Sequence, residues 1–140
     1  MFFEKGKQIW IVIFFDKDYT MTILKIKKFR KQVFLIMKNK IYEETKHGLV
    51  THLPKEIDHH SADEIKKVID RKIEFDCISN IIFDFSDTEF MDSSGIGLLL
   101  GRYKMVQYLG GRVSAVNVTD NIVRMIKMSG IDKFISVKGL

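Results

Sequence analysis

The stretch ISNIIFDFSDTEFMDSSGIGLLLGRYK, residues 78–104, decides the fold. It opens with residues 78–85, which are few and apolar enough to form a strand buried in the centre of a sheet. An acidic loop follows, and from Ile96 onward the apolar residues recur at helical spacing. The pattern predicts a central strand, a loop and a helix over residues 93–109, which Gly110 and Gly111 stop.

The segments on either side extend this unit into an alternating domain. Ser61 and Glu64 form a capping-box pattern at a helix start, and Pro54 predicts an interruption or an exposed edge in the strand before it. The predicted elements are strands at 40–45 and 49–57 joined at His47–Gly48, a helix at 61–74, the strand and helix above, a strand at Arg112–Val118, a helix from the Thr119 cap to Gly130, and a strand at 134–137. The fold class is therefore α/β, a mixed β-sheet with helices packed on it.

Residues 1–36 differ in composition from the rest of the chain. They carry half of the aromatic residues, eight Lys or Arg and three acidic residues, whereas residues 37–140 carry fifteen charges of each sign. Their apolar run at 9–15 is too short to span a bilayer, which needs roughly 20 residues. We interpret 1–36 as an atypical extension and 37–140 as the domain. Three alternatives stay open for the extension: a strand pair or helix added to the domain, a membrane-surface contact, or a stretch that is not native, with Met37 the true start.

Charge and cysteine content exclude further classes. The net charge of +5 lies wholly in residues 1–36, so the folded domain has no positive excess with which to bind a nucleic acid. Cys77 is the only cysteine, which rules out an intramolecular disulfide and fits a reducing cytoplasm. Because Cys77 lies among apolar residues, we expect it to be a small core side chain.

The helix start at Ser93, Ser94 and Gly95 is the candidate functional site. In open α/β sheets, functional groups gather beyond the carboxyl ends of the strands, and a helix N-terminus favours a phosphate. Gly95 and Gly97 have no side chain, so a partner's backbone or a phosphate can come close. On residues alone, the simpler interpretation is that Ser93 or Ser94 only caps the helix.

Enzymatic and cofactor-binding interpretations are weaker. The motif is not G-x-S-x-G, because aspartate rather than glycine precedes the serine pair. His59 and His60 are the only nearby candidates for a catalytic base. Gly95 and Gly97 lack the third glycine of a dinucleotide site. The spacing of the nearby aspartates matches no metal-binding loop; these are Asp58, Asp84, Asp87 and Asp92. We therefore expect no enzyme activity, no catalytic residue and no metal.

Four runs carry a family resemblance: FMDSSGIGLLLGRYK at 90–104, EIDHHSADEI at 56–65, the pair Gly110–Gly111, and MSGIDKFI at 128–135. They resemble the anti-sigma factor antagonists of the STAS family, most closely its sporulation members, over residues 40–137. The resemblance implies the STAS fold, with the helices on one face of the sheet. It also implies that Ser94 accepts a phosphoryl group, and that the phosphosite surroundings and partner-binding residues are Asp58, Asp92, Ser93, Gly95 and Gly97.

The resemblance implies a partner-switching cycle. The unphosphorylated domain would bind an anti-sigma factor with serine kinase activity and so free a sporulation sigma factor. The kinase would phosphorylate Ser94 with its own ATP, so the domain would need no cofactor, and a PP2C-type phosphatase would reverse the step. Such a protein acts in the cytoplasm without direct contact to nucleic acid or membrane. The alternative is a stand-alone STAS signalling module that binds a nucleotide or another regulatory protein.

The sequence departs from the family pattern in three places. Lys55, after Pro54, replaces a glycine that is usual in the turn before the acidic residue, so the shape of the Asp58 loop is left open. Relatives usually add a final helix after the position of Leu140, and residues 1–36 have no counterpart.

Overall fold

A computed structural model describes residues 2–4, 9–11 and 41–140. The chain divides into two compact units, Met1–Leu35 and Ile36–Leu140. In the first unit, β1 (Phe2–Glu4) pairs with β2 (Ile9–Ile11) in antiparallel orientation. The other predictions for residues 1–36 lie outside the described residues. No helix in the described ranges is long and apolar enough to cross a bilayer.

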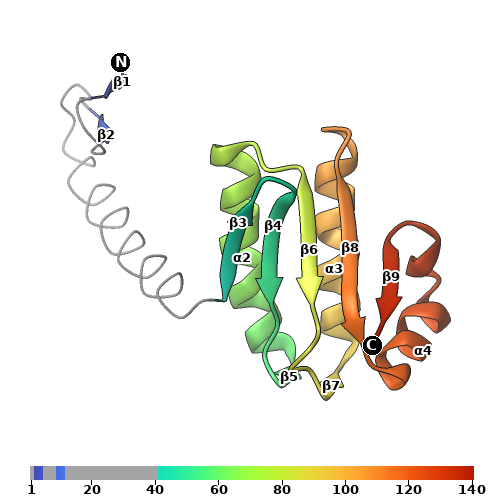
Figure 1. Ribbon diagram of the computed structural model, residues 1–140. Helices are drawn as coiled ribbons and strands as arrows, with labels where there is room; N and C mark the ends of the chain where they lie inside the picture. Colours follow the sequence, from blue (N-terminus) through green and yellow to red (C-terminus); the bar gives the residue numbers. More distant parts are fainter. Residues whose placement is uncertain (1, 5–8, 12–40) are drawn as a thin grey trace. The chain divides into compact units, whose positions relative to one another are not determined.

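The second unit is built on one five-stranded mixed sheet in the order β3-β4-β6-β8-β9 (Figure 1). Its strands are β3 (Tyr42–Thr45), β4 (Gly48–His52), β6 (Asn80–Asp84), β8 (Arg112–Val118) and β9 (Ser136–Gly139). β3 and β4 form an antiparallel hairpin, and all other neighbours run parallel. The predicted central strand is thus confirmed as β6, between β4 and β8.

Helices α2 (His59–Asp76) and α3 (Ser93–Gln107) pack side by side on one face of this sheet (Figure 1). Alternate strand residues are buried in the core beneath them, among them Leu49, Ile81, Phe83, Val113 and Ala115. Burying one large aliphatic or aromatic side chain stabilises a fold by about 1.5–3 kcal/mol, so this layer dominates the stability of the domain. The predicted α/β class, a mixed sheet with helices on one face, is confirmed.

The chain finishes with α4 (Asp120–Ser129), a short 3-10 turn, η1 (Ile131–Lys133), and β9 at the sheet edge. Thr119 is the N-cap of α4, as predicted, although its side chain makes no cap hydrogen bond. Gly130 ends α4 in the left-handed conformation, with φ of 74°, which glycine adopts without steric cost. Ile122 and Ile126 bury the inner face of α4.

Several predicted boundaries are wrong. The strand expected at 49–57 is divided: β4 ends at His52, and after Pro54 a second strand, β5 (Glu56–Ile57), pairs outside the main sheet. The first helix begins at His59 rather than 61, because Asp58 and not Ser61 is its cap. The last strand begins at Ser136 rather than 134, because η1 continues the chain in helical conformation after Gly130.

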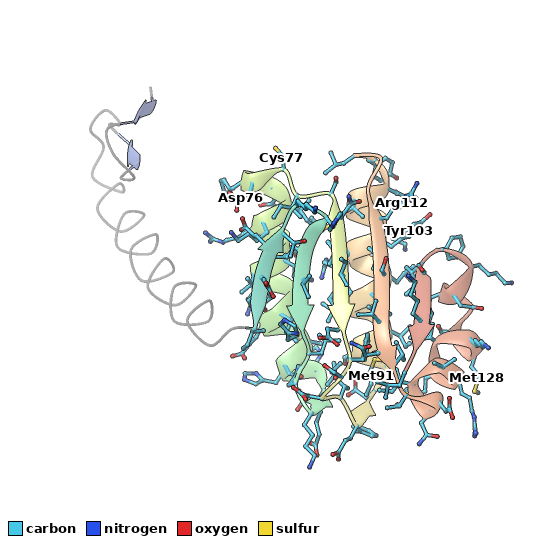
Figure 2. The ribbon with its side chains drawn as sticks, viewed as in Figure 1. Asp76, Cys77, Met91, Tyr103, Arg112 and Met128 are labelled. Atoms are coloured by element: carbon cyan, nitrogen blue, oxygen red, sulfur yellow. The ribbon has the colours of Figure 1, made fainter. Side chains whose placement is uncertain are left out.

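The prediction that Cys77 is a core residue is also wrong. Its side chain is exposed, directly after the last residue of α2, at the end of the sheet opposite Met91 (Figure 2). The helix runs to Asp76 rather than to 74, so Cys77 occupies the left-handed C-cap with φ of 54° instead of turning inward.

Candidate functional site

A small parallel strand pair positions the site. β5 pairs with β7 (Phe90–Met91) beyond the carboxyl ends of β4 and β6, with Ile57 opposite Met91 (Figure 1). The Asp92 N–H donates to the Ile57 carbonyl at 3.0 Å. Lys55 forms an ion pair with Glu89 at 3.4 Å. The pairing therefore brings the loop before α2 against the loop before α3.

Asp58 is held by a capping box at the start of α2. Its Oδ1 accepts from the Ser61 N–H at 2.8 Å, and its own N–H donates to the Ser61 Oγ at 3.0 Å. The hydrogen bond from the Ser61 backbone lowers the pKa of the Asp58 carboxyl below its ordinary value. Because the side chain is exposed, the charge of Asp58 is presented at the surface beside the start of α3.

Asp92 performs the same task for α3. Its Oδ1 accepts from the Ser94 N–H at 2.7 Å, so the simpler interpretation, that Ser93 or Ser94 caps this helix, is wrong. The Ser94 side chain is half-buried, and its hydroxyl makes no hydrogen bond to any described residue, whereas Ser93 is exposed. The cap is thus independent of the Ser94 hydroxyl, which is left available for chemistry.

The two glycines of the site differ in surroundings. Gly95 is buried, and a Cβ at this position would lie 2.2 Å from Met91 Cγ and 3.3 Å from Ile57 Cγ2. Gly95 therefore lets α3 pack directly on the β5–β7 pair. Gly97 is exposed, and a Cβ there would meet no atom within 4 Å. Of the two positions, only Gly97 offers its backbone to an approaching molecule.

A groove runs between α2 and α3 from the Ser94 end. Its volume is about 260 Å³, and the residues that line it are His59, Ala62, Asp63, Lys66, Ser94, Gly97, Leu98, Gly101 and Arg102. Asp63 forms an ion pair with Lys67 at 2.6 Å. The hydrogen bond from Lys67, and then the charges of Lys66 and His59, lower the pKa of Asp63. Apart from Asp63, which is paired with Lys67, the charged side chains that line the groove are the cations Lys66 and Arg102.

Arg102 lies at the base of this groove and is 4% exposed. Its Nε is 2.9 Å from Asp70 Oδ1, but neither atom has hydrogen-bond geometry, and Nη1 has no hydrogen-bond partner among the described residues. Burial lowers the pKa of Arg102 and raises that of Asp70, and the opposite charge of each partner counteracts the effect. The guanidinium is thus a buried cation with incomplete compensation.

Two of the remaining sequence candidates, Asp84 and His60, contact other polar side chains. Within the described residues, no group of three or more His, Cys, Asp or Glu side chains could hold a metal ion. Asp84 bonds to His52 at 2.8 Å and Asn117 at 2.9 Å. His60 is exposed and lies 3.4 Å from Glu64. The structure brings Asp58, Asp92, Ser93, Ser94 and Gly97 to one end of the helix pair. Asp84 alternates with the core residues Ile81 and Phe83, so its side chain lies on the face of the sheet away from the helices.

Sequence reasoning missed Lys66, Asp70 and Arg102. Arg102 stands in the run at 90–104 that carries the family resemblance, and Lys66 and Asp70 stand in the predicted first helix. Their i, i+4 spacing places Lys66 and Asp70 on one helical face, which was the available signal. That this face meets α3 is settled only by packing.

The chain matches the family described as STAS domain over residues 39–139. It is 34% identical over 89 residues to an anti-sigma F factor antagonist of Paenibacillus polymyxa, covering 64% of this chain and 76% of that protein. It is 32% identical over 87 residues to an anti-sigma F factor antagonist of Lysinibacillus sphaericus, covering 62% of this chain and 74% of that protein.

Solved structures of anti-sigma factor antagonists also resemble this chain. The anti-sigma factor antagonist SpoIIAA in its unphosphorylated form has a TM-score of 0.57 and 30% identity, over 69% of this chain and 84% of that chain. The phosphorylated form of the Bacillus SpoIIAA has a TM-score of 0.58 and 31% identity, over 69% of this chain and 87% of that chain. An anti-sigma-factor antagonist (STAS) domain protein of Planctomyces limnophilus, at 17% identity and a TM-score of 0.62 over 70% and 86%, shares the fold.

Proposed function

This chain belongs to the STAS domain family, and on that premise we propose that it is an anti-sigma factor antagonist controlled by phosphorylation of Ser94. The unphosphorylated domain binds an anti-sigma factor that is also a serine kinase, and this binding releases a sporulation sigma factor. The similarity to two anti-sigma F factor antagonists supports this class of partner. The proposed place of action is the cytoplasm, without direct contact to nucleic acid or membrane.

The observation that carries the proposal is that the Ser94 hydroxyl takes no part in capping α3. Asp92 caps α3 through the Ser94 backbone N–H, and the hydroxyl has no hydrogen bond to a described residue. The side chain is partly exposed at the rim of the groove. It can therefore gain a phosphoryl group without loss of the helix cap, and the positive end of the α3 dipole favours the added charge.

In the proposed reaction the domain is a substrate. The Ser94 Oγ attacks the γ-phosphorus of ATP that is bound to the kinase, a new O–P bond forms, and the bond to the bridging oxygen of ADP breaks. The hydroxyl proton passes to a base of the kinase. A metal-dependent phosphatase of the PP2C type later hydrolyses the phosphoserine to serine and inorganic phosphate. The domain contributes no catalytic residue and needs no cofactor of its own.

Electrostatics supplies the reason for the switch. A phosphoserine carries about −1.5 to −2 charges at pH 7. At Ser94 the phosphate would lie beside the carboxylate of Asp92. It would also lie near the carboxylate of Asp58, because Ile57 and Met91, which precede the two aspartates, are paired in the β5–β7 ladder. A closely packed or anionic partner surface would then be repelled, since like charges at an interface weaken binding. The α/β core need not change for the affinity to fall.

The test uses the full chain, ATP and the serine-kinase anti-sigma factor encoded in the same genome. Intact mass should increase by one phosphoryl group, and tandem mass spectrometry should place it on Ser94. Ser94→Ala should remain unmodified with its fold intact, because the backbone N–H that Asp92 caps is retained. Ser93→Ala is the matched control and should still be phosphorylated.

Modification at Ser93, Thr88 or another position would contradict the assignment. Nucleotide binding by the isolated chain without phosphorylation would favour the stand-alone module instead.

A further inference from the structure

The groove beside Ser94 contains positively charged side chains that are incompletely paired within the described residues. Lys66 and His59 line it from α2, and Arg102 lines its base from α3. Lys66 has no ion pair within 4 Å among the described residues, although its charge reaches Asp63 and Asp70. Arg102 retains an unpartnered Nη1 beside its single partner, Asp70. These side chains therefore have capacity for one more anion.

The arrangement of α2 and α3 places these cationic side chains in the same groove as Ser94. Both helices follow parallel strands, so their N-termini lie at the same end of the sheet (Figure 1). Lys66 and Ser94 line the same groove. Long side chains on a helix lean toward its N-terminus, which for Lys66 is the direction of the end where Ser94 lies. Gly97, one turn after Ser94, also lines the groove and adds no side chain to it.

Resting on the function proposed above, we propose that the phosphoryl group on Ser94 is held inside this α2–α3 groove by Lys66 and His59, with Arg102 adding charge from below. The phosphorylated state then differs from the unphosphorylated state in two ways. The groove is occupied, so a partner side chain can no longer enter it, and the phosphate is tied to α2. Phosphorylation thereby fills the groove as well as adding charge.

The carboxylates near the groove act against the cationic side chains in their effect on a phosphate at Ser94. Asp92 caps α3, Asp58 caps α2, Asp63 pairs with Lys67 and Asp70 pairs with Arg102. All four would raise the second pKa of a phosphoserine, whereas Lys66 and Arg102 would lower it. The change in that pKa on removal of Lys66 alone measures whether the phosphate lies within reach of its ammonium group.

The experiment installs phosphoserine at position 94 of the full chain by genetic code expansion, so no kinase is needed. Phosphorus NMR titration then gives the second pKa of the phosphate in the parent, in Lys66→Gln, in His59→Gln and in Lys104→Gln. Lys66→Gln should raise that pKa by about 0.2–0.7, the size expected for loss of a partly exposed ion pair. His59→Gln should raise it by less.

Lys104→Gln is the matched control, because Lys104 is exposed near the end of α3 and does not line the groove. It should leave the phosphate pKa unchanged. Because Lys66 is exposed, its replacement should preserve the fold, which amide proton–nitrogen spectra of each variant verify. An identical phosphate pKa in the parent and Lys66→Gln would overturn the inference. That result would leave the kinase-dependent phosphorylation and partner binding proposed above untouched, and those are measured separately on unmodified chain.

Discussion

Asp58 and Asp92 directly follow two residues, Ile57 and Met91, that face each other in the parallel β5–β7 pair, and each aspartate is the N-cap of the helix that comes next. The two caps are therefore neighbours because the strands before them are in register. The same pairing brings the starts of α2 and α3 together and places Ser94 at the rim of the groove between the helices. One local strand pair thus organises the whole candidate site.

Substitutions at Asp92 should separate capping from charge. Asp92→Ala removes the acceptor for the Ser94 N–H and should lower the free energy of unfolding by about 0.5–2 kcal/mol. Asp92→Asn should retain most of the stability, because asparagine caps as well as aspartate. Urea denaturation of the three proteins measures this difference. Equal stability of Asp92→Ala and the parent would contradict the capping role.

The charges of the two caps should matter for function as well as for structure. Asp58→Asn and Asp92→Asn should remain folded but show altered phosphorylation of Ser94 or altered affinity for the anti-sigma factor, since each removes a negative charge near the acceptor. Phosphorylation rates and equilibrium binding report the effect, with Asp132→Asn, at an exposed position of the η1 turn, as the control. Unchanged values in both variants would reduce Asp58 and Asp92 to structural caps.

Gly95 and Gly97 should respond to alanine with opposite signs. Gly95→Ala forces a methyl group onto the buried Met91 side chain and should cost about 1–3 kcal/mol. Gly97→Ala meets no atom and should stabilise α3 by about 0.5–1 kcal/mol, because alanine loses less conformational freedom in a helix. Thermal melts of the pair provide matched measurements. Destabilisation of similar size in both would show that the close contact at Gly95 is not the cause.

Asp84 should make the domain sensitive to acid. Burial, the largest single influence, raises the pKa of Asp84, but hydrogen bonds from Asn117, Ser86 and His52 together lower it below 3.8. A carboxyl whose folded pKa lies below its unfolded pKa contributes stability that is present above about 3.8 and is lost as the pH falls through the folded value. Asp84→Asn should therefore be less stable at neutral pH, with a shallower loss of stability below about pH 4.

The measurement is the melting temperature of the parent and Asp84→Asn between about pH 7 and pH 2.5. The exposed Asp132→Asn variant again serves as the control for removal of one carboxylate. Parallel curves for the parent and Asp84→Asn would contradict a stabilising role for the ionised Asp84.

Residues 1–36 should be dispensable for the domain. A chain that begins at Met37 should fold cooperatively, remain competent for phosphorylation and be more soluble than the full chain, because the apolar run at 9–15 is an association hazard when exposed. If these residues instead contribute core contacts, truncation should lower the melting temperature by roughly 4–8 °C for each kcal/mol lost. Comparative melts decide between the two, and a clearly destabilised short chain would contradict dispensability.

Much of the fold could be predicted from the sequence because local patterns report which residues must be buried. The apolar run before Phe85 marked the central strand, and the helical spacing after Ser93 marked α3. The boundaries were less predictable, since caps compete locally. Ser61 and Asp58 both suit an N-cap, and Asp58 became the cap because pairing of Ile57 with Met91 fixes the chain just before it.

The sequence by itself determined the α/β class and the central position of β6, because both depend on apolar patterns within short stretches of the chain. The choice of Ser94 as the candidate phosphorylation site came instead from the resemblance of the run at 90–104 to the STAS family, since the residues alone favoured a simple helix cap. Only the tertiary structure decided that Asp92 caps α3, that Gly95 packs on Met91, and that Lys66 and Arg102 line a groove with Ser94. These relationships depend on which faces of α2 and α3 meet, and that is set by the packing of both helices on a shared sheet. A linear pattern specifies the buried face of each helix but not the side chains that two helices bring together.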